Sequence, residues 1–140
     1  MAEPRMRVLA LDYGSARCGC ALSDPTGTIV TPIEAVARPA TKRGFAHLRE
    51  LVRERAVERV IVGLPLSLDG SDTDQTRETR AFAAELSQRL GDEVAVEMHD
   101  ERFTTRIAQQ MEGAGGSFKA SEDSRAAAHM LESWLAARSR

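Results

Sequence analysis

Three acidic positions have the residue types and the settings that phosphate chemistry uses. Asp12 lies near the end of an apolar run, the pair Asp100-Glu101 follows a second strand-like stretch, and Asp123 opens a helical stretch. An ionised carboxylate in an apolar run is costly to bury unless a partner or a metal ion compensates it. Because Mg²⁺ and Mn²⁺ prefer oxygen ligands, carboxylates drawn from several separate elements predict a metal site for phosphate chemistry.

Each of these acids also has a purely structural interpretation. Asp12 at a strand end can accept backbone N–H bonds from the following Gly14-Ser15 turn. Asp100-Glu101 and Asp123 can each lie in the first turn of a helix, where a negative charge complements the helix dipole. The choice between a metal site and these structural roles depends on whether the fold brings the acids to one place.

Basic and hydroxyl side chains flank the acids and are candidate contacts to a scissile phosphate or its neighbours. Arg102 has an equally good alternative, which is an ion pair with Asp100 and no other role. His99 precedes Glu101 by two residues, and a solvated imidazole at a strand end is its structural interpretation. The candidate phosphate contacts are Arg17, Arg102, Thr104 and Thr105.

The length, composition and net charge of the chain limit the kinds of protein that could carry such a site. A chain of 140 residues with 42% hydrophobic residues is long enough for one folded domain, expected to span residues 1–140 with loose ends at 1–5 and 138–140. No apolar run is long enough to cross a bilayer, so we expect a cytoplasmic protein without a membrane partner. The net charge of −2 means that any contact with nucleic acid must be local. Cys18 and Cys20 lack the further ligands of a zinc site and are expected to be buried as small apolar residues.

The hydrophobic pattern predicts five strands and four helices in the order βββαβαβαα. A meander followed by alternating helices and strands predicts an α/β fold with a five-stranded mixed sheet, three strands antiparallel and the others added in parallel. Ligands of such sheets gather at the carboxyl ends of the parallel strands. The expected strands are 6–13, 17–23, 28–36, 60–63 and 93–98, and the helices begin after Thr41, follow Asp72, and cover 104–112 and 123–138.

Four segments together resemble the YqgF/RuvX family of Holliday-junction-resolvase-like nucleases, in the RNase H-like superfamily. They occur in the family's order and span nearly the whole chain. The segments are Leu11-Asp12-Tyr13-Gly14-Ser15-Ala16-Arg17-Cys18-Gly19; Val62-Gly63-Leu64-Pro65 with Asp69-Gly70-Ser71; Asp100-Glu101-Arg102-Phe103-Thr104-Thr105; and Asp123-Ser124-Arg125-Ala126-Ala127 leading into Leu131-Glu132-Ser133-Trp134-Leu135.

The resemblance implies an RNase H-like fold and a catalytic, metal-binding set of Asp12, Glu101 and Asp123 that holds two Mg²⁺ or Mn²⁺ ions. It further implies one of two substrates, namely structured RNA such as the precursor of small-subunit ribosomal RNA, or a four-way DNA junction. A junction resolvase is expected to be a two-fold homodimer, whereas an RNA-processing enzyme can act as a monomer. Lys119, the basic residue in the 113–121 loop before Asp123, is a further candidate phosphate contact.

Two other functional classes remain to be compared with the nuclease. An Asp-x-Gly turn between two strands also begins the phosphate loop of actin-like and sugar-kinase folds, but those folds use two related domains. A non-catalytic nucleic-acid-binding module of the same fold is expected to have lost one or more acids. All three acids are present here, which favours the nuclease.

Overall fold

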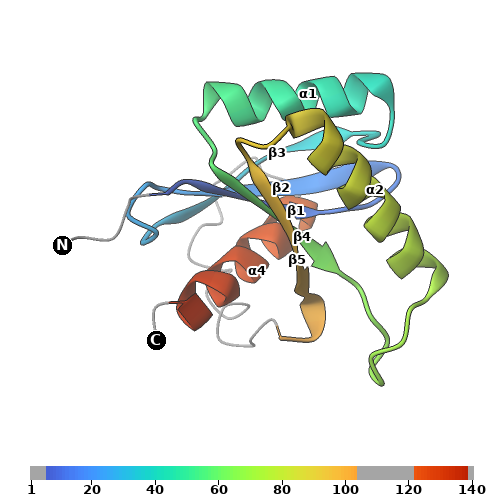
Figure 1. The fold of residues 1–140 in the computed structure, drawn as a ribbon. Coiled ribbons are helices and arrows are strands. Elements are labelled where there is room, and N and C mark those ends of the chain that lie inside the picture. Colours follow the sequence, from blue (N-terminus) through green and yellow to red (C-terminus); the bar gives the residue numbers. More distant parts are fainter. Residues whose placement is uncertain (1–5, 104–121, 139–140) are drawn as a thin grey trace.

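The computed structural model describes residues 6–103 and 122–138, which form one five-stranded sheet with helices on both faces (Figure 1). The strand order is β3-β2-β1-β4-β5, so β1 lies at the centre of the sheet. The elements are β1 (Val8–Asp12), β2 (Arg17–Ser23), β3 (Val30–Ala37), α1 (Lys42–Glu54), β4 (Arg59–Leu64), α2 (Asp74–Leu90), β5 (Ala95–Asp100), the 3₁₀ turn η1 (Glu101–Phe103) and α4 (Glu122–Arg138).

Strand pairing confirms the predicted mixed sheet. β2 is antiparallel to both β1 and β3, whereas β4 runs parallel to β1 and β5 runs parallel to β4. The register pairs Asp12 with Gly19 across β1 and β2, and Leu64 with Asp100 across β4 and β5. The carboxyl ends of β1, β4 and β5 therefore lie along one edge of the sheet.

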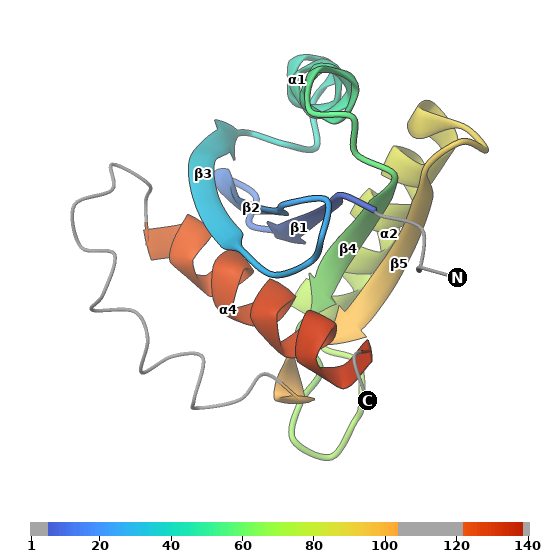
Figure 2. The same ribbon diagram turned by 90° about the vertical axis from the view of Figure 1, so that its left-hand side faces the viewer.

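Helix α4 covers one face of the sheet (Figure 2). Val8, Ala10 and Ile61 point from the strands into a buried cluster with Leu131 and Trp134 of α4. Side chains alternate between the two faces of a strand, so Asp12 follows Val8 and Ala10 on the α4 side. The helix that begins beside Asp123 thus packs on the same face as the Asp12 carboxylate.

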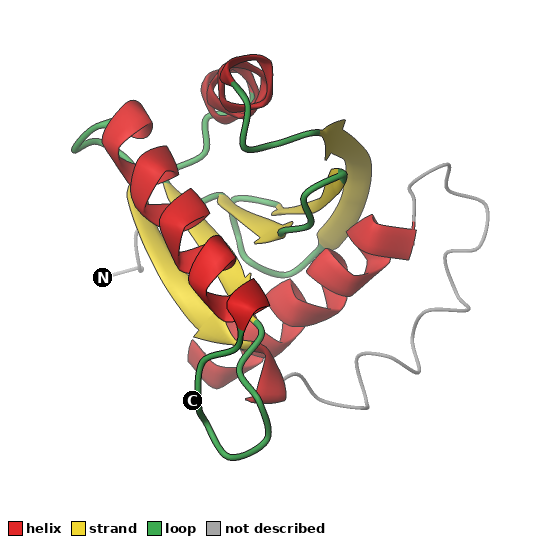
Figure 3. Ribbon diagram, turned by 90° about the vertical axis from the view of Figure 1, so that its right-hand side faces the viewer, coloured by secondary structure: helices red, strands yellow, loops and turns green. Residues whose placement is uncertain are grey.

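Helices α1 and α2 cover the other face, where they bury the opposite set of strand residues (Figure 3). Phe45 and Phe82 stack with ring centroids 5.6 Å apart within this larger core. Cys18 and Cys20 are free and fully buried there, which confirms their interpretation as small apolar residues. Thr41 caps α1 as predicted, accepting a 3.0 Å hydrogen bond from the Gly44 backbone N–H.

The fifth strand differs from its prediction by two residues at each end. It runs from Ala95 to Asp100, because parallel pairing with β4 continues as far as Leu64 and Asp100. Asp100 is therefore the last residue of the strand rather than a residue that follows it. At the C-terminus α4 includes Arg138, expected to be part of a loose end, whose guanidinium lies 4.7 Å from the centroid of the Trp134 ring.

The predicted helix 104–112 and the loop 113–121 lie outside the described residues, as do 1–5 and 139–140. Within residues 6–103 and 122–138, no helix has both the length and the apolar character needed to cross a membrane.

Candidate active site

Asp12 ends the central strand and faces α4, in surroundings that disfavour its ionised form. Burial raises the pKa of the Asp12 carboxyl from 3.8 to about 6, and the negative charge of Asp123 adds to the effect. Both influences indicate a partly desolvated carboxylate, and no cation among the described residues neutralises its charge. An Asp12 that accepts hydrogen bonds from the Gly14-Ser15 turn would not show such a shift, because hydrogen bonds from backbone N–H groups lower a carboxyl pKa.

Glu101 begins η1, directly after β5, and its carboxylate turns back over the neighbouring strand. A Cβ built on Gly63 of β4 would lie 2.7 Å from Glu101 Oε2 and 2.7 Å from Met130 Sδ of α4. The missing side chain at Gly63 therefore makes room for the carboxylate between strand and helix. Burial raises the pKa of Glu101 to about 7, with further contributions from the charges of Asp12 and Asp100.

Asp123 is placed by a close approach of α4 to β2. A Cβ on Gly19 would lie 2.0 Å from the Asp123 carbonyl oxygen, so only glycine allows the helix to come this near. The Cys20 backbone N–H donates a 3.1 Å hydrogen bond to the buried Ser124 Oγ and fixes the first turn of α4. Arg17 Nε lies 3.5 Å from Asp123 Oδ2 in an exposed ion pair.

The fold thus brings Asp12, Glu101 and Asp123 from three elements to one edge of the sheet. There the charge of Asp12 raises the pKa of Glu101, and the charge of Asp123 raises the pKa of Asp12. In the described part of the chain, no group of three or more His, Cys, Asp or Glu side chains is gathered closely enough to hold an ion jointly. The donors themselves fit Mg²⁺ or Mn²⁺, since all three are carboxylates and two are desolvated.

Arg102 forms the ion pair with Asp100 that one of its two interpretations predicted. Its Nε and Nη2 donate to the Asp100 carboxylate at 3.0 and 2.6 Å, and its backbone N–H donates to Asp100 Oδ1 at 2.9 Å. Arg102 Nη1 also donates at 3.1 Å to the Leu68 carbonyl oxygen. One guanidinium therefore links the segment that carries Glu101 to the loop between β4 and α2.

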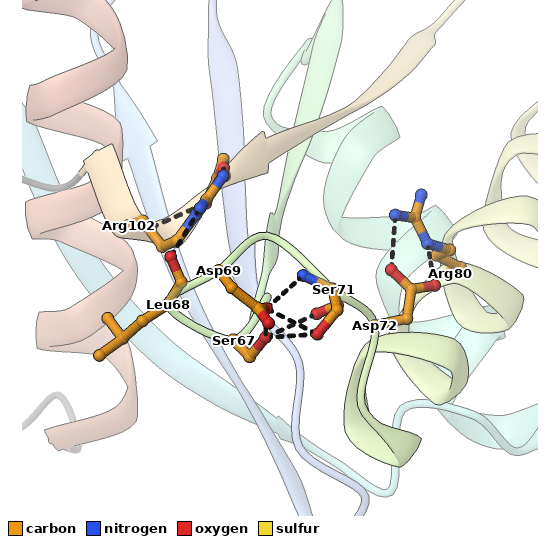
Figure 4. Close-up of polar contacts among 8 residues, drawn as sticks. Ser67, Leu68, Asp69, Ser71, Asp72, Arg80 and Arg102 are labelled. Carbon is orange, nitrogen blue, oxygen red and sulfur yellow. Dashed lines mark hydrogen bonds and ion pairs between the residues drawn. The ribbon is translucent and has the colours of Figure 1, made fainter.

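That loop, residues 65–73, is the part of the site that sequence reasoning missed (Figure 4). Asp69 Oδ1 accepts hydrogen bonds from Ser67 Oγ at 2.5 Å and from the Ser71 backbone N–H at 2.9 Å. These bonds lower the pKa of Asp69 to about 2. Gly70, with φ of +88°, makes the tight turn, and a Cβ on it would lie 3.4 Å from Arg102 Nη1. Its turn-forming residues were visible in the sequence, but their contact with Arg102 was not.

The remaining predicted residues have different outcomes. Thr104, Thr105 and Lys119 lie outside the described residues. His99 is half-buried on β5, and burial lowers its pKa while the charges of Asp100 and Glu97 oppose the shift.

Comparison with known proteins adds a family and a set of relatives. Residues 6–137 match a family described as RuvX, Holliday junction resolvase. A protein of Maridesulfovibrio salexigens is 37% identical over 94% of this chain and 98% of its own length. One from Mycobacteroides abscessus is 38% identical over 97% of this chain and 84% of its own length. Both carry the name "Putative pre-16S rRNA nuclease".

Solved structures show the fold to be that of RuvC-like resolvases. Thermus thermophilus RuvC in complex with a Holliday junction substrate superimposes with a TM-score of 0.68 at 16% identity, covering 96% of both chains. The fowlpox virus resolvase in complex with Holliday junction DNA gives a TM-score of 0.63 at 10% identity, covering 96% of this chain and 100% of that one. At such identities the likeness concerns the fold alone, and it agrees with the predicted RNase H-like architecture.

Proposed function

Because this chain belongs to the RuvX family, we propose that it is a metal-dependent endonuclease that hydrolyses phosphodiester bonds in structured nucleic acid. The names of its curated relatives, which it matches over nearly its whole length, support nuclease activity. The observation that carries the proposal is the pair of desolvated carboxylates, Asp12 and Glu101, whose pKa values are raised at the strand ends beside Asp123. Fixed, uncompensated negative charge of this kind attracts divalent cations.

In this proposal Asp12, Glu101 and Asp123 are both the catalytic residues and the ligands of two Mg²⁺ or Mn²⁺ ions. The ions, when bound, supply an activated water for attack on phosphorus and stabilise the leaving oxygen. Gly63 and Gly19 serve this arrangement by leaving space for the Glu101 carboxylate and for the first turn of α4. The substrate contacts we assign are Arg17, Arg102, Thr104, Thr105 and Lys119.

The protein's own groups prepare the site before substrate arrives. Because the pKa of Glu101 is about 7, its carboxyl is partly protonated and partly ionised near neutral pH. Binding of a cation to this carboxyl would displace the remaining proton. Arg17, paired with the exposed Asp123 carboxylate, is within reach of a phosphate that approaches the same edge. Arg102 is bonded to Asp100, so its first role is to hold the 65–73 loop beside Glu101.

The substrate we favour is the precursor of small-subunit ribosomal RNA, as the names of the curated relatives suggest. The same proposal keeps the predicted cytoplasmic location. To test it, labelled precursor RNA and a labelled four-way DNA junction are each incubated with the protein in Mg²⁺, in Mn²⁺ and in excess chelator. We expect RNA cleavage that requires a metal ion and is absent from Asp12→Asn. Cleavage that persists in chelator, or none of either substrate with either metal, would overturn the proposal.

Junction resolution is the second candidate, because the matching family is described by that activity. Symmetric cutting of two strands requires two active sites related by a two-fold axis, and hence a dimer. Junction cleavage together with a dimeric mass in solution favours the resolvase. RNA cleavage by a monomer favours processing, and nucleic-acid binding without cleavage favours the non-catalytic module.

A further inference from the structure

Three exposed cations lie where β3 leads into α1, and we call them the α1 basic cluster: Arg38, Lys42 and Arg43. The Arg38 backbone N–H donates a 2.9 Å hydrogen bond to the Ala16 carbonyl oxygen. The register of β2 and β3 pairs the next residue, Arg17, with Ala37. Arg17 pairs in turn with Asp123 of the proposed metal site. The cluster therefore lies next to Arg17 at the edge that carries the proposed catalytic acids, and α1 begins on the same side of the molecule as the turn between β1 and β2 (Figure 1).

The cluster has no counter-charge in the described part of the chain. Within residues 6–103 and 122–138, no carboxylate forms an ion pair with Arg38, Lys42 or Arg43. No acid stands three or four residues after Lys42 or Arg43, which is the spacing of an ion pair along a helix. The first turn of α1 holds no acid either, and a positive charge in that turn opposes the helix dipole. An anion from outside the chain would supply the counter-charge that the described fold does not.

Arg38 carries its side chain on a backbone that would suit glycine better. Its φ is +43°, in the left-handed region that residues with a Cβ rarely adopt. The start of α1 imposes this conformation, because Thr41 Oγ1 donates to the Arg38 carbonyl oxygen at 2.8 Å and a Cβ on Gly44 would lie 2.2 Å from that oxygen. Glycine at position 38 would make the same turn without strain. What arginine adds there is a positive charge beside Arg17.

The position of the cluster tells which anion it fits. The net charge of the chain is −2, so a nucleic acid must be held by local groups of positive charge. A nucleic-acid strand carries a phosphate about every 3.4 Å along a duplex, so the phosphates next to the cut are the nearest anions to the cluster. Arginine binds a phosphate through two parallel N–H bonds, and lysine binds it as a point charge. The anion that fits is therefore the backbone of the substrate itself.

On the basis of the proposed nuclease function, we propose that the α1 basic cluster binds the phosphates on one side of the cut, so that the backbone of the substrate continues from Arg17 over the end of β3 to the first turn of α1. Two properties of the substrate follow. It must extend past the cut on that side. Its base sequence there is not read, because contacts to phosphates position a nucleic acid without specifying its bases. The nucleotides on the other side of the cut are bound without the cluster.

The test uses two double variants of α1 that remove the same charge from the same helix. Lys42→Gln with Arg43→Gln neutralises the first turn. The matched control, Arg49→Gln with Arg53→Gln, neutralises later turns, centred about 13 Å further along the helix axis. There α1 approaches the start of β4, at the opposite edge of the sheet. Affinity for both labelled substrates is measured by fluorescence polarisation in the Asp12→Asn background across a series of salt concentrations.

A second comparison locates the contact on the substrate. Each substrate that the wild type cuts is also prepared in two shortened forms, in which the nucleotides on one side or the other of the mapped cut are removed. We expect the double variant at Lys42 and Arg43 to reduce the slope of log affinity against log salt by about 2 on the intact substrate, which is about 1 for each lost phosphate contact. The control should leave the slope unaltered. One shortened form should abolish the difference between the two double variants, and the other should keep it.

Arg38→Gly tests the third cation, and it should weaken binding several-fold without a loss of thermal stability, because glycine fits the turn. Thermal melting of each variant checks that the fold is intact.

Three outcomes would overturn the proposal. These are equal salt slopes for the two double variants, a difference between them that survives on both shortened forms, and wild-type affinity in Arg38→Gly. Equal slopes would leave an acidic protein as the partner that fits the cluster. Failure of the nuclease function itself is seen separately, since the wild type would then cut neither substrate, while the salt slopes would still report on the cluster.

Discussion

Two sets of acids at the same edge of the sheet have opposite electrostatics. Asp12 and Glu101 lie between the strands and α4, where burial and the charges of neighbouring carboxylates raise their pKa values to about 6 and about 7. Asp69, Asp72 and Asp100 lie in the adjoining loop and strand end, where hydroxyl, backbone and guanidinium donors lower their pKa values. Among the residues that the structure describes, donors satisfy the second set, and the first set has no such donors.

The difference separates a structural acid from one available for a cation. A carboxylate that accepts several internal hydrogen bonds has little capacity left for a ligand, whereas a desolvated one gains free energy when a positive charge arrives. Asp100 and Glu101 are neighbours in the sequence and yet belong to different sets. Residue type and spacing alone therefore do not tell a hydrogen-bonded carboxylate from a desolvated one.

The largest expected effect is on cleavage. Asp12→Asn, Glu101→Gln and Asp123→Asn should each reduce metal-dependent turnover by about a thousandfold or more, because each removes a negative ligand from the proposed metal site. Asp72→Asn removes the same charge from a residue paired with Arg80 and should retain activity within a few-fold. Initial rates at saturating metal measure both.

If one of the three acid variants keeps wild-type turnover at saturating metal, that residue is not a ligand. If Asp72→Asn is as inactive as they are, the division of the acids into two sets is wrong.

Sequence reasoning predicted the sheet and the place of Asp12 at its edge because both depend on local patterns. The apolar run before Asp12 specifies a buried strand, and the acid at its carboxyl end then lies where parallel strands gather ligands. The need for glycine at positions 19 and 63 depends instead on where α4 crosses the sheet. The spacing of residues within one segment does not predict that crossing.

The limits of β5 were mispredicted because pairing with β4 sets them, from Arg59 and Ala95 to Leu64 and Asp100. A polar residue inside the strand is likewise tolerated because it has tertiary partners. Glu97 pairs with Arg59 of β4 and accepts a 3.2 Å hydrogen bond from Trp134 Nε1 of α4. Partners so distant in sequence cannot be read from the strand itself, and the same holds for the contact of Arg102 with Leu68.

The next effect is on stability, and its sign distinguishes the two sets. The folded protein disfavours ionised Asp12, so this group costs stability as pH rises from about 4 through about 6, and the cost is relieved as pH falls. Asp12→Asn should therefore raise the free energy of unfolding at pH 7.5 by about 1–2 kcal/mol, allowing for partial solvent screening, and change it little at pH 4. Denaturant unfolding in chelator at the two pH values measures this.

Asp69→Asn provides the opposite case. Its lowered pKa means that folding favours the ionised form, so the contribution of Asp69 is present above pH 4 and is lost as pH falls through about 2. The substitution should lower stability at pH 7.5, where Asp12→Asn raises it. Changes of the same sign in both variants would contradict the contrast between the two sets.

The smallest effect concerns Arg17, the exposed cation that pairs with Asp123. Its side chain is 67% exposed and its 3.5 Å ion pair with Asp123 is open to solvent, so breaking that pair should hardly change stability. If Arg17 contacts a phosphate, Arg17→Ala should weaken binding several-fold and reduce the slope of log affinity against log salt by about 1.

Arg49→Ala makes the same change of charge on the exposed side of α1, on the opposite face of the sheet, and should leave the slope unaltered. Binding is measured in the Asp12→Asn background across a series of salt concentrations. Equal slopes for the two arginine variants would place Arg17 outside the interface and leave it as a partner of Asp123 alone.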